Sequence, residues 1–387
     1  MNERRQGAMR LAMITQDFPP DIGGTQRYAL ELANRLAASC GDFLLLAPDI
    51  PGGSSFDAEL DFEVQRVGGS YNLHWYHAYR RLSNLRATRP FDAVLHIQWS
   101  TALLTNRLRN GSRPIPNVII AHGRELLFNP FSGGPLNAAY QALRRSVLSR
   151  SAAIVAISDQ TATIARRLAA ATPVTIVYNG TDPEKMKPDP SVANPFRRPG
   201  QRIILSMSRL VYRKGVDLLI RALPAVRARV GDVRLLVAGA GPEEAALHEL
   251  ANETEVRAHV DFVGATPPEE AARYYNMCDV FAMCARESHT DIEGFGLVYL
   301  EANACLKPVV GSRVGGVPSA IVDGETGFLV DAEDVGQISD ALSRILLDDE
   351  LARRMGEAGR RRVVEYYNWD RIHDEVLALL KSKTSLP

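Results

Sequence analysis

The chain has 387 residues, of which 46% are hydrophobic and 23% charged, a composition typical of a globular protein with two or three domains. Its 45 basic and 45 acidic side chains sum to zero, which argues against a nucleic-acid partner. The four cysteines are too sparse for a disulfide scaffold.

Short apolar runs alternate with longer amphipathic stretches along the first half of the chain. We expect strands at residues 11–15, 43–47, 62–67, 93–97, 118–121, 153–157 and 174–177. Helices are predicted between them, at residues 25–38, 136–149 and 160–170. This alternation indicates a parallel sheet with crossover helices. The proline-rich stretch 183–200 has no periodicity and is predicted to be an interdomain linker.

A second alternating series follows this stretch. We expect strands at residues 202–207, 233–238, 260–263, 280–283, 308–311 and 328–330. Helices are predicted at residues 216–230, 243–255, 268–277, 296–305 and 335–347. The last segment, 350–380, is expected to be helical with an interruption at 366–369.

The pattern predicts an α/β protein with two doubly wound Rossmann-like domains that face each other across a ligand cleft. We expect an N-terminal domain over residues 1–190 and a C-terminal, nucleotide-sugar-binding domain over residues 191–365. Residues 366–387 form a C-terminal helix that could cross back to the first domain.

A glycine pair, Gly23 and Gly24, separates the first predicted strand from the first helix. Glycines let the backbone approach a ligand closely, and the helix N-terminus offers unpaired N–H groups to an anion. The alternative is a plain turn, because no G-x-G-x-x-G fingerprint is present. Gly239 and Gly241, after the second strand of the second domain, carry an even weaker signal.

Two cations, Arg209 and Lys214, lie between the first strand of the second domain and the helix that follows it. A guanidinium and an ammonium beside a helix N-terminus suit a diphosphate. The alternative is a pair of solvated surface cations.

Two carboxylates, Glu293 and Glu301, are eight residues apart and flank a glycine-containing loop. Gly294, Phe295 and Gly296 form that loop immediately before a predicted helix. The loop could offer amides and one carboxylate to a sugar, and Glu301 could accept from a ribose hydroxyl. The alternative is a capped helix with exposed acids.

A histidine, His122, follows the fifth predicted strand and could face the cleft, although lone histidines are more often structural. Asp17 and the loop from His122 to Glu125 are weaker candidates for acceptor contacts. The chain has no Asp-x-Asp pair and no zinc spacing of cysteine and histidine, so no metal site is expected. It also lacks the G-x-S-x-G and P-loop motifs.

These elements, taken in order, resemble the retaining glycosyltransferases of family 4, which have the GT-B fold of two Rossmann-like domains. The most specific feature is the E-x7-E pattern from Glu293 to Glu301, supported by the Gly23–Gly24 pair and the run S-R-L-V-Y-R-K-G at 208–215. The stretches 15–24 and 281–286 look most like the bacterial phosphatidylinositol mannosyltransferase branch, which uses GDP-mannose.

The resemblance implies a role for each motif residue. Arg209 and Lys214 would bind the donor diphosphate, and Glu293 would hold hydroxyls of the donor sugar. The remaining implied donor contacts are the loop at Gly294, Phe295 and Gly296, the ribose acceptor Glu301, the phosphate-facing Gly23 and Gly24, and Val263 near the base. His122 would lie near the sugar. No cofactor and no metal are implied beyond the nucleotide-sugar substrate itself.

We therefore expect a retaining transferase that moves a hexose, with mannose favoured, from a nucleotide sugar to a lipid-linked or saccharide hydroxyl. A UDP-hexose donor with a soluble acceptor is an alternative. A pyridoxal-dependent phosphorylase is a second enzyme alternative, although no lysine can be assigned to the cofactor. A two-lobed sugar-binding protein is an alternative of another class, although no signal peptide is evident.

The neutral total charge hides a cationic segment. Residues 66–150 contain twelve arginines but only two acids, Asp92 and Glu125. The stretches 79–86 and 140–150 mix apolar and basic residues at helical spacing, which suits a helix on an anionic bilayer. A solvated basic face is the alternative. No apolar run is long enough to span a membrane, so we expect a cytoplasmic protein that could bind the inner face of the membrane peripherally.

Overall fold

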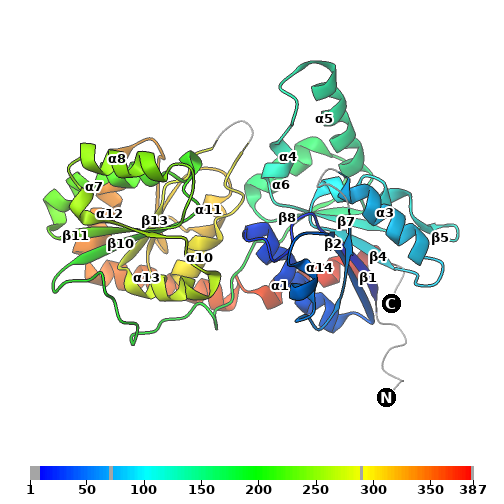
Figure 1. The fold of residues 1–387 in the computed structure, drawn as a ribbon, viewed down its shortest axis with the longest axis horizontal. Coiled ribbons are helices and arrows are strands. Elements are labelled where there is room, and N and C mark those ends of the chain that lie inside the picture. Colours follow the sequence, from blue (N-terminus) through cyan, green and yellow to red (C-terminus); the bar gives the residue numbers. More distant parts are fainter. Residues whose placement is uncertain (1–8, 69–72, 288–290, 385–387) are drawn as a thin grey trace. The chain divides into compact units, whose positions relative to one another are not determined.

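The computed structural model describes residues 9–68, 73–287 and 291–384. The chain forms two compact units; in Figure 1 the first is coloured from blue to green with a red C-terminal helix, and the second from green to orange. The first unit comprises Met1–Tyr178 together with Trp369–Pro387, and the second comprises Asn179–Asn368.

The first unit is built on a parallel sheet of seven strands in the order β3-β2-β1-β4-β7-β8-β9. Its strands are β1 Arg10–Ile14, β2 Asp42–Pro48, β3 Glu63–Val67, β4 Ala93–His96, β7 Asn117–Ala121, β8 Ala153–Ala156 and β9 Val174–Ile176. All seven predicted strands are therefore confirmed to within two residues. The sequence analysis missed a short antiparallel pair, β5 Arg109–Asn110 and β6 Arg113–Pro114, because two-residue strands carry no periodicity.

Helices cover both faces of this sheet, because a parallel sheet must bury both of its faces. The helices are α1 Gly24–Ser39, α2 Gly53–Asp57, α3 His74–Leu85, α4 Arg124–Leu127, α5 Gly134–Ser149, α6 Asp159–Leu168 and α14 Trp369–Lys383, with short 3-10 turns at Trp99–Ala102 (η1) and Thr105–Arg107 (η2). Ala12 and Ile14 of β1 belong to the same buried hydrophobic cluster as Leu82 of α3. On the α1 side, the buried Tyr28 ring meets Trp369 of α14 edge-on, with 5.5 Å between centroids.

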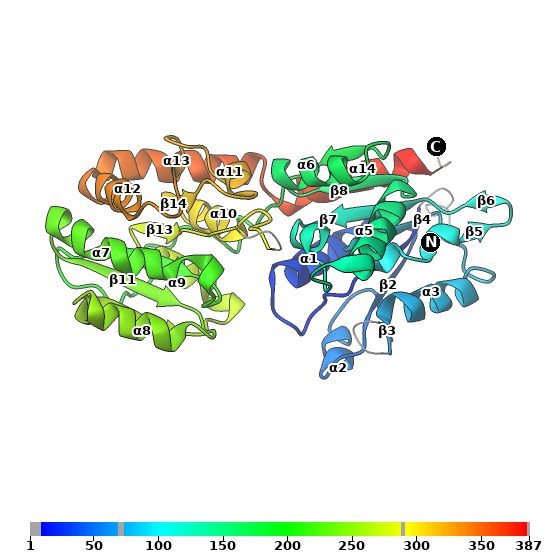
Figure 2. The same ribbon diagram turned by 90° about the horizontal axis from the view of Figure 1, so that it is seen from above.

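The second unit repeats this architecture with six parallel strands in the order β12-β11-β10-β13-β14-β15 (Figure 2). Its strands are β10 Arg202–Met207, β11 Val233–Ala238, β12 Val260–Gly264, β13 Val280–Met283, β14 Val309–Ser312 and β15 Gly327–Val330. Its helices are α7 Val216–Val230, α8 Glu244–Glu253, α9 Ala271–Met277, α10 Leu297–Ala304, α11 Val317–Ala320, α12 Val335–Leu347 and α13 Asp349–Glu365, with 3-10 turns at Tyr212–Lys214 (η3), Arg257–His259 (η4) and Pro268–Glu270 (η5). The six predicted strands are again confirmed.

Residues 183–200, predicted as an interdomain linker, lie inside the second unit, which begins at Asn179. Hydrogen bonds tie this irregular segment to the end of α9. The Asp189 amide donates to Asn276 Oδ1 at 2.8 Å, and Asn194 Nδ2 donates to the Met277 carbonyl at 2.7 Å. Proline content signalled the lack of secondary structure, but it could not show that the segment is anchored to one unit.

Strand order fixes where each unit can bind a ligand. In the first unit β1 lies between β2 and β4, and in the second unit β10 lies between β11 and β13. The connections after such a central strand and its neighbour leave in opposite directions, which opens a crevice at the carboxyl ends of the strands. In the described part of the chain, no helix is long and apolar enough to cross a membrane.

Candidate active site

The predicted phosphate-binding cations lie in the loop after β10 of the second unit. Arg209 is exposed, and within the described residues its guanidinium has no partner. Lys214 ends the short turn η3 and is largely buried, with 16% of its side chain exposed. Gly215, which follows, has φ of +68°, and this left-handed residue turns the chain into α7.

Lys214 meets Glu293 from the loop after β13, the neighbouring strand. Its Nζ donates to Glu293 Oε2 at 2.6 Å, and Arg213 Nη1 donates to the same oxygen at 2.7 Å. Burial alone would raise the pKa of Glu293, but the two cations outweigh burial and hold its pKa at about 2. Glu293 is therefore a charged carboxylate at neutral pH, and the cations of Arg213 and Lys214 compensate its negative charge.

Arg286 fixes the backbone of the cation loop. Its guanidinium binds both carboxylate oxygens of Asp217 at 2.8 Å, donates to the Tyr212 carbonyl at 3.0 Å and lies 4.2 Å from the Tyr212 ring centroid. The Arg286 amide also donates to the Arg213 carbonyl at 2.7 Å. Arg286 thus joins the loops after β10 and β13, and this holds Lys214 and Glu293 in one place.

The glycine loop before α10 requires its glycines for steric reasons. Gly296 has φ of +90°, and a Cβ there would come within 2.6 Å of the Tyr299 ring. The backbone of Glu293 is held from the other side, where the Gly316 amide donates to the Glu293 carbonyl at 2.7 Å. A Cβ on Gly315 would meet that carbonyl at 2.4 Å. The G-G pair at 315–316 therefore supports the acidic loop.

The other predicted donor residues have different surroundings. Glu301 is buried in α10, and its Oε2 accepts a hydrogen bond from the Tyr275 hydroxyl at 2.7 Å. Phe295 is also buried, with its ring 6.1 Å from that of Tyr367, so only its backbone could reach a ligand. Val263 is half-buried in β12, next to Phe262, whose ring stacks on His248 at 3.9 Å.

Gly239 and Gly241 serve to pack two loops together. A Cβ on Gly239 would come within 1.9 Å of the Ser208 carbonyl, and one on Gly241 within 2.2 Å of the Leu210 carbonyl. The loop after β11 therefore lies against the loop that carries Arg209. A lone G-x-G gave little signal because each glycine is needed for a contact with a residue 31 positions earlier in the sequence, Ser208 for Gly239 and Leu210 for Gly241.

In the first unit, polar side chains gather at the carboxyl ends of β1 and β4. Gln98 Nε2 donates to Asp17 Oδ2 at 2.6 Å, and the Gln16 amide donates to Gln98 Oε1 at 3.0 Å. Gly23 is extended and precedes α1, whose first residue is Gly24. A Cβ on Gly24 would meet nothing within 4 Å, so the backbone is open there.

His122 lies at the end of β7, next to this cluster. Its ring meets Tyr28 edge-on at 4.9 Å, and its Nε2 is buried without a partner among the described residues. Burial lowers the pKa of His122 to about 4, so the imidazole is neutral at pH 7. Glu125 Oε1 accepts from the His122 amide at 2.8 Å, and burial raises the pKa of Glu125 to about 7.

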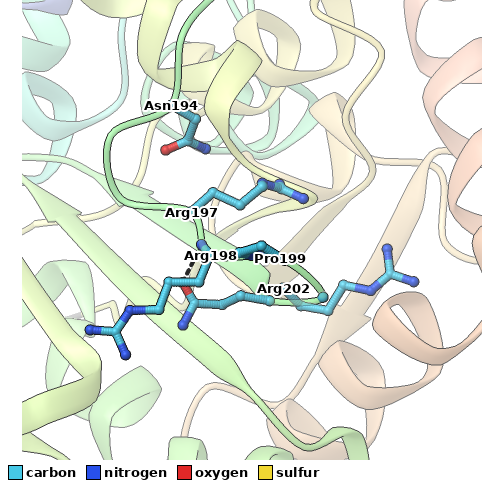
Figure 3. A pocket seen from close by; sticks show the side chains of 7 residues that line it. Asn194, Arg197, Arg198, Pro199 and Arg202 are labelled. Carbon is cyan, nitrogen blue, oxygen red and sulfur yellow. Dashed lines mark hydrogen bonds between the residues drawn. The ribbon is translucent and has the colours of Figure 1, made fainter.

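A separate pocket of about 460 Å³ is lined by Asn194 and residues 197–202 of the second unit. Its three arginines suggest an anion site, but Arg197 is paired with Asp279 at 2.9 Å and Arg202 with Asp349 at 2.7 Å. Figure 3 shows the side chains of Arg197, Arg198 and Arg202 pointing in different directions. Because no polar groups converge there, we assign the pocket no ligand.

Sequence reasoning missed Arg213 and Arg286 as members of the site. Arg213 lies inside the run 208–215, but nothing in a sequence shows which of two adjacent cations will meet a carboxylate 80 residues later. Arg286 follows β13, and a position after a strand next to the switch point is a signal that could have found it.

The class of protein follows from this geometry and from comparison with known proteins. Residues 191–362 match the family model described as glycosyl transferases group 1, and residues 22–185 match glycosyltransferase family 4. Solved structures agree in fold. Sucrose-phosphate synthase from Thermosynechococcus elongatus aligns with a TM-score of 0.80 at 22% identity, covering 96% of this chain and 98% of that one. Anabaena HepE in complex with UDP also reaches 0.80, at 18% identity, covering 97% and 100%.

Two named relatives align with almost the whole chain. The GDP-mannose-dependent alpha-(1-6)-phosphatidylinositol monomannoside mannosyltransferase of Mycolicibacterium smegmatis is 34% identical, covering 93% of this chain and 95% of that protein. The Mycobacterium tuberculosis protein of the same name is 31% identical, covering 96% and 98%. The chain therefore belongs to glycosyltransferase family 4. It is a hexosyltransferase with the GT-B fold, as the motifs predicted.

Proposed function

We propose that the protein transfers a mannosyl group from GDP-mannose to a hydroxyl of a mannosylated inositol phospholipid at the inner face of the membrane, with retention of anomeric configuration. The names of the two relatives support this donor and acceptor. The observation that carries the proposal is the meeting of Lys214, Arg213 and Glu293 at the switch point of the second unit.

Lys214 and Arg209 bind the donor diphosphate in this proposal. The Lys214 side chain remains 16% exposed, so its ammonium can contact a phosphate oxygen while it keeps its ion pair with Glu293. The Arg209 guanidinium has no partner among the residues that the structure describes, so it can bind phosphate through two donors. Together they stabilise the negative charge that grows on the departing diphosphate. With this charge supplied by side chains, we propose a reaction that needs no metal and no cofactor.

Glu293 holds sugar hydroxyls in this proposal and does not act as a nucleophile. A carboxylate with a pKa of about 2 and two cations on one oxygen is a poor nucleophile. The bond from the anomeric carbon to the phosphate oxygen breaks, and its electron pair leaves with GDP. The acceptor oxygen bonds to the same face of that carbon, and its proton passes to the departing phosphate oxygen. Recovery of a mannosyl ester on the Glu293 peptide would contradict this role.

Asp17 and His122 are the proposed acceptor contacts in the first unit. A neutral His122 with a partnerless buried Nε2 can exchange one hydrogen bond with a substrate hydroxyl. Asp17 is ordered by Gln98 and can accept from another hydroxyl.

A donor panel tests the proposal. GDP-mannose, UDP-glucose, UDP-galactose and UDP-N-acetylglucosamine are each incubated with a dispersed phosphatidylinositol mannoside, and nucleotide release is measured. We expect GDP release from GDP-mannose that depends on the acceptor, and background release from the others. Preferred turnover of a UDP-hexose would overturn the donor assignment, and binding without turnover of any donor would favour a sugar-binding protein.

A further inference from the structure

A buried tyrosine holds Glu301, the predicted ribose contact of the second unit. The Tyr275 hydroxyl, near the end of α9, donates to Glu301 Oε2 at 2.7 Å. Tyr275 is fully buried, and Glu301 is only 6% exposed. A hydrogen bond to a carboxylate is stronger than one between neutral groups, and exclusion of water strengthens it further. Tyr275 therefore restricts the positions that the Glu301 carboxylate can take.

The Tyr275 ring is itself fixed by two other aromatic rings. It packs edge-on against Phe281 of β13, with 5.6 Å between centroids, and Phe281 packs edge-on against Tyr299 of α10 at 5.7 Å. All three rings are fully buried. Close packing of this kind keeps each ring in one rotamer. The Tyr275 hydroxyl therefore reaches Glu301 from one fixed direction.

The helix that carries Tyr275 is anchored by the next residue, Asn276. Its Nδ2 donates to the Lys187 carbonyl at 2.9 Å and lies 3.8 Å from Cys305 Sγ at the end of α10. Its Oδ1 accepts from the Asp189 amide at 2.8 Å. Because α9 has only seven residues, its position depends on such tertiary contacts. The irregular segment 183–200 and α10 thus hold α9, and α9 holds Tyr275.

A fixed Glu301 carboxylate would favour ribose binding for an entropic reason. A glutamate side chain has several rotatable bonds, and a ligand that must order it loses affinity. The bond from Tyr275 orders the carboxylate before the ligand arrives. A carboxylate can accept about four hydrogen bonds. Tyr275 therefore leaves acceptor capacity on Glu301 for the neighbouring hydroxyls of a ribose.

We propose that Tyr275 is a positioning residue that orients Glu301 toward the ribose hydroxyls of the donor nucleotide. Through Glu301 it gives the protein its preference for a ribose over a sugar that lacks these hydroxyls. This inference rests on the proposed function in one respect, because it takes Glu301 as the ribose contact of a nucleotide-sugar donor.

Calorimetric titration with GDP and with 2′,3′-dideoxy-GDP tests the inference on the full chain. Tyr275→Phe removes only the hydroxyl and keeps the ring against Phe281. We expect the parent to bind GDP at least about tenfold more tightly than the dideoxy compound. Tyr275→Phe should bind GDP roughly tenfold more weakly than the parent, with the affinity for dideoxy-GDP changed by less than about twofold.

Tyr367→Phe is the matched control. The Tyr367 hydroxyl donates to the Ser319 carbonyl at 3.0 Å, and Tyr367 is 5% exposed. The control therefore also removes one buried, hydrogen-bonded hydroxyl from the second unit. We expect it to bind both nucleotides with the parent's affinities.

Glu301→Leu tests whether Tyr275 acts through Glu301. This variant should lose the preference for GDP over dideoxy-GDP, because leucine cannot accept a hydrogen bond. In the Glu301→Leu background, Tyr275→Phe should change that preference no further, since the two residues act as one unit. The double variant also replaces both hydrogen-bonding partners with apolar groups, so its fold does not bury an unpaired Tyr275 hydroxyl.

The outcomes separate this inference from the proposed function. Equal losses of GDP and dideoxy-GDP affinity in Tyr275→Phe would indicate a general loosening and overturn the inference. Unchanged GDP affinity in that variant, no ribose preference in the parent, or a lost preference in Tyr367→Phe would also overturn it. If the parent binds UDP in place of GDP, the GDP-mannose donor is wrong, and UDP with 2′,3′-dideoxy-UDP then tests Tyr275. Binding of neither nucleotide would contradict the proposed function and the inference together.

Discussion

Replacing Lys214 with alanine is expected to lower turnover of the nucleotide sugar by roughly 10²–10³-fold. The ammonium is the buried cation that reaches both Glu293, at 2.6 Å, and the proposed position of the donor diphosphate. Its loss removes a charge that becomes more valuable as the diphosphate leaves, so kcat should fall more than KM rises. Steady-state GDP release over a range of GDP-mannose concentrations measures both constants.

Lys185→Ala is the matched control for this variant. It removes the same side chain from the same unit, but Lys185 is exposed and its ion pair with Asp182 is 3.5 Å long. We expect parental kinetics, because exposed ion pairs of this kind contribute little. Equal rates for Lys214→Ala and the parent would show that the cation loop is not the donor site.

Gly215→Ala is expected to lower turnover by about 10²-fold, because a misplacement of about 1 Å at a catalytic group has that effect. A Cβ at this position would lie 1.9 Å from the Cys284 carbonyl, so the backbone of one loop must move. Those two loops carry Lys214 and Arg286, and displacing them separates Lys214 from Glu293. GDP release and urea unfolding of the same preparation measure activity and stability together.

Gly231→Ala, at the other end of α7, is the control that distinguishes backbone strain from the steric clash with the Cys284 carbonyl. Gly231 also has a positive φ, +98°, but a Cβ there would meet nothing within 4 Å. Gly215→Ala carries the cost of a left-handed conformation and Gly231→Ala, with ψ of −124°, carries a backbone cost at least as large, each on the order of 1–3 kcal/mol, but only Gly215→Ala adds the collision. Similar turnover in the two variants would contradict the proposed coupling of the loops.

The fold was predictable because its determinants are local. Strands buried on both faces form short continuous apolar runs, such as residues 43–47, and amphipathic helices such as 335–347 show their period directly. Placing Arg209 and Lys214 between the first strand and first helix of the second unit, and Glu293 in a loop before a helix, needed only the order of elements along the chain.

The partners within the site were not predictable, because they depend on contacts between distant segments. Lys214 and Glu293 are separated by 79 residues, and the Tyr275 hydroxyl that engages Glu301 lies 26 residues away. The sequence also did not show which side chains are exposed. The basic and apolar residues of 140–150 are compatible with a buried helix or with a helix at the surface. Only the structure shows that α5 buries Val147 and Leu148 but exposes Leu143.

The anomeric configuration of the product is the most direct test of the central claim, which is retaining mannosyl transfer from a nucleotide sugar. The product formed from GDP-mannose and a phosphatidylinositol mannoside is analysed by NMR before any re-equilibration. We predict a new mannosyl residue with the α configuration of the donor, formed in step with GDP release. A β-linked product, or GDP release without a new glycosidic bond, would contradict the account.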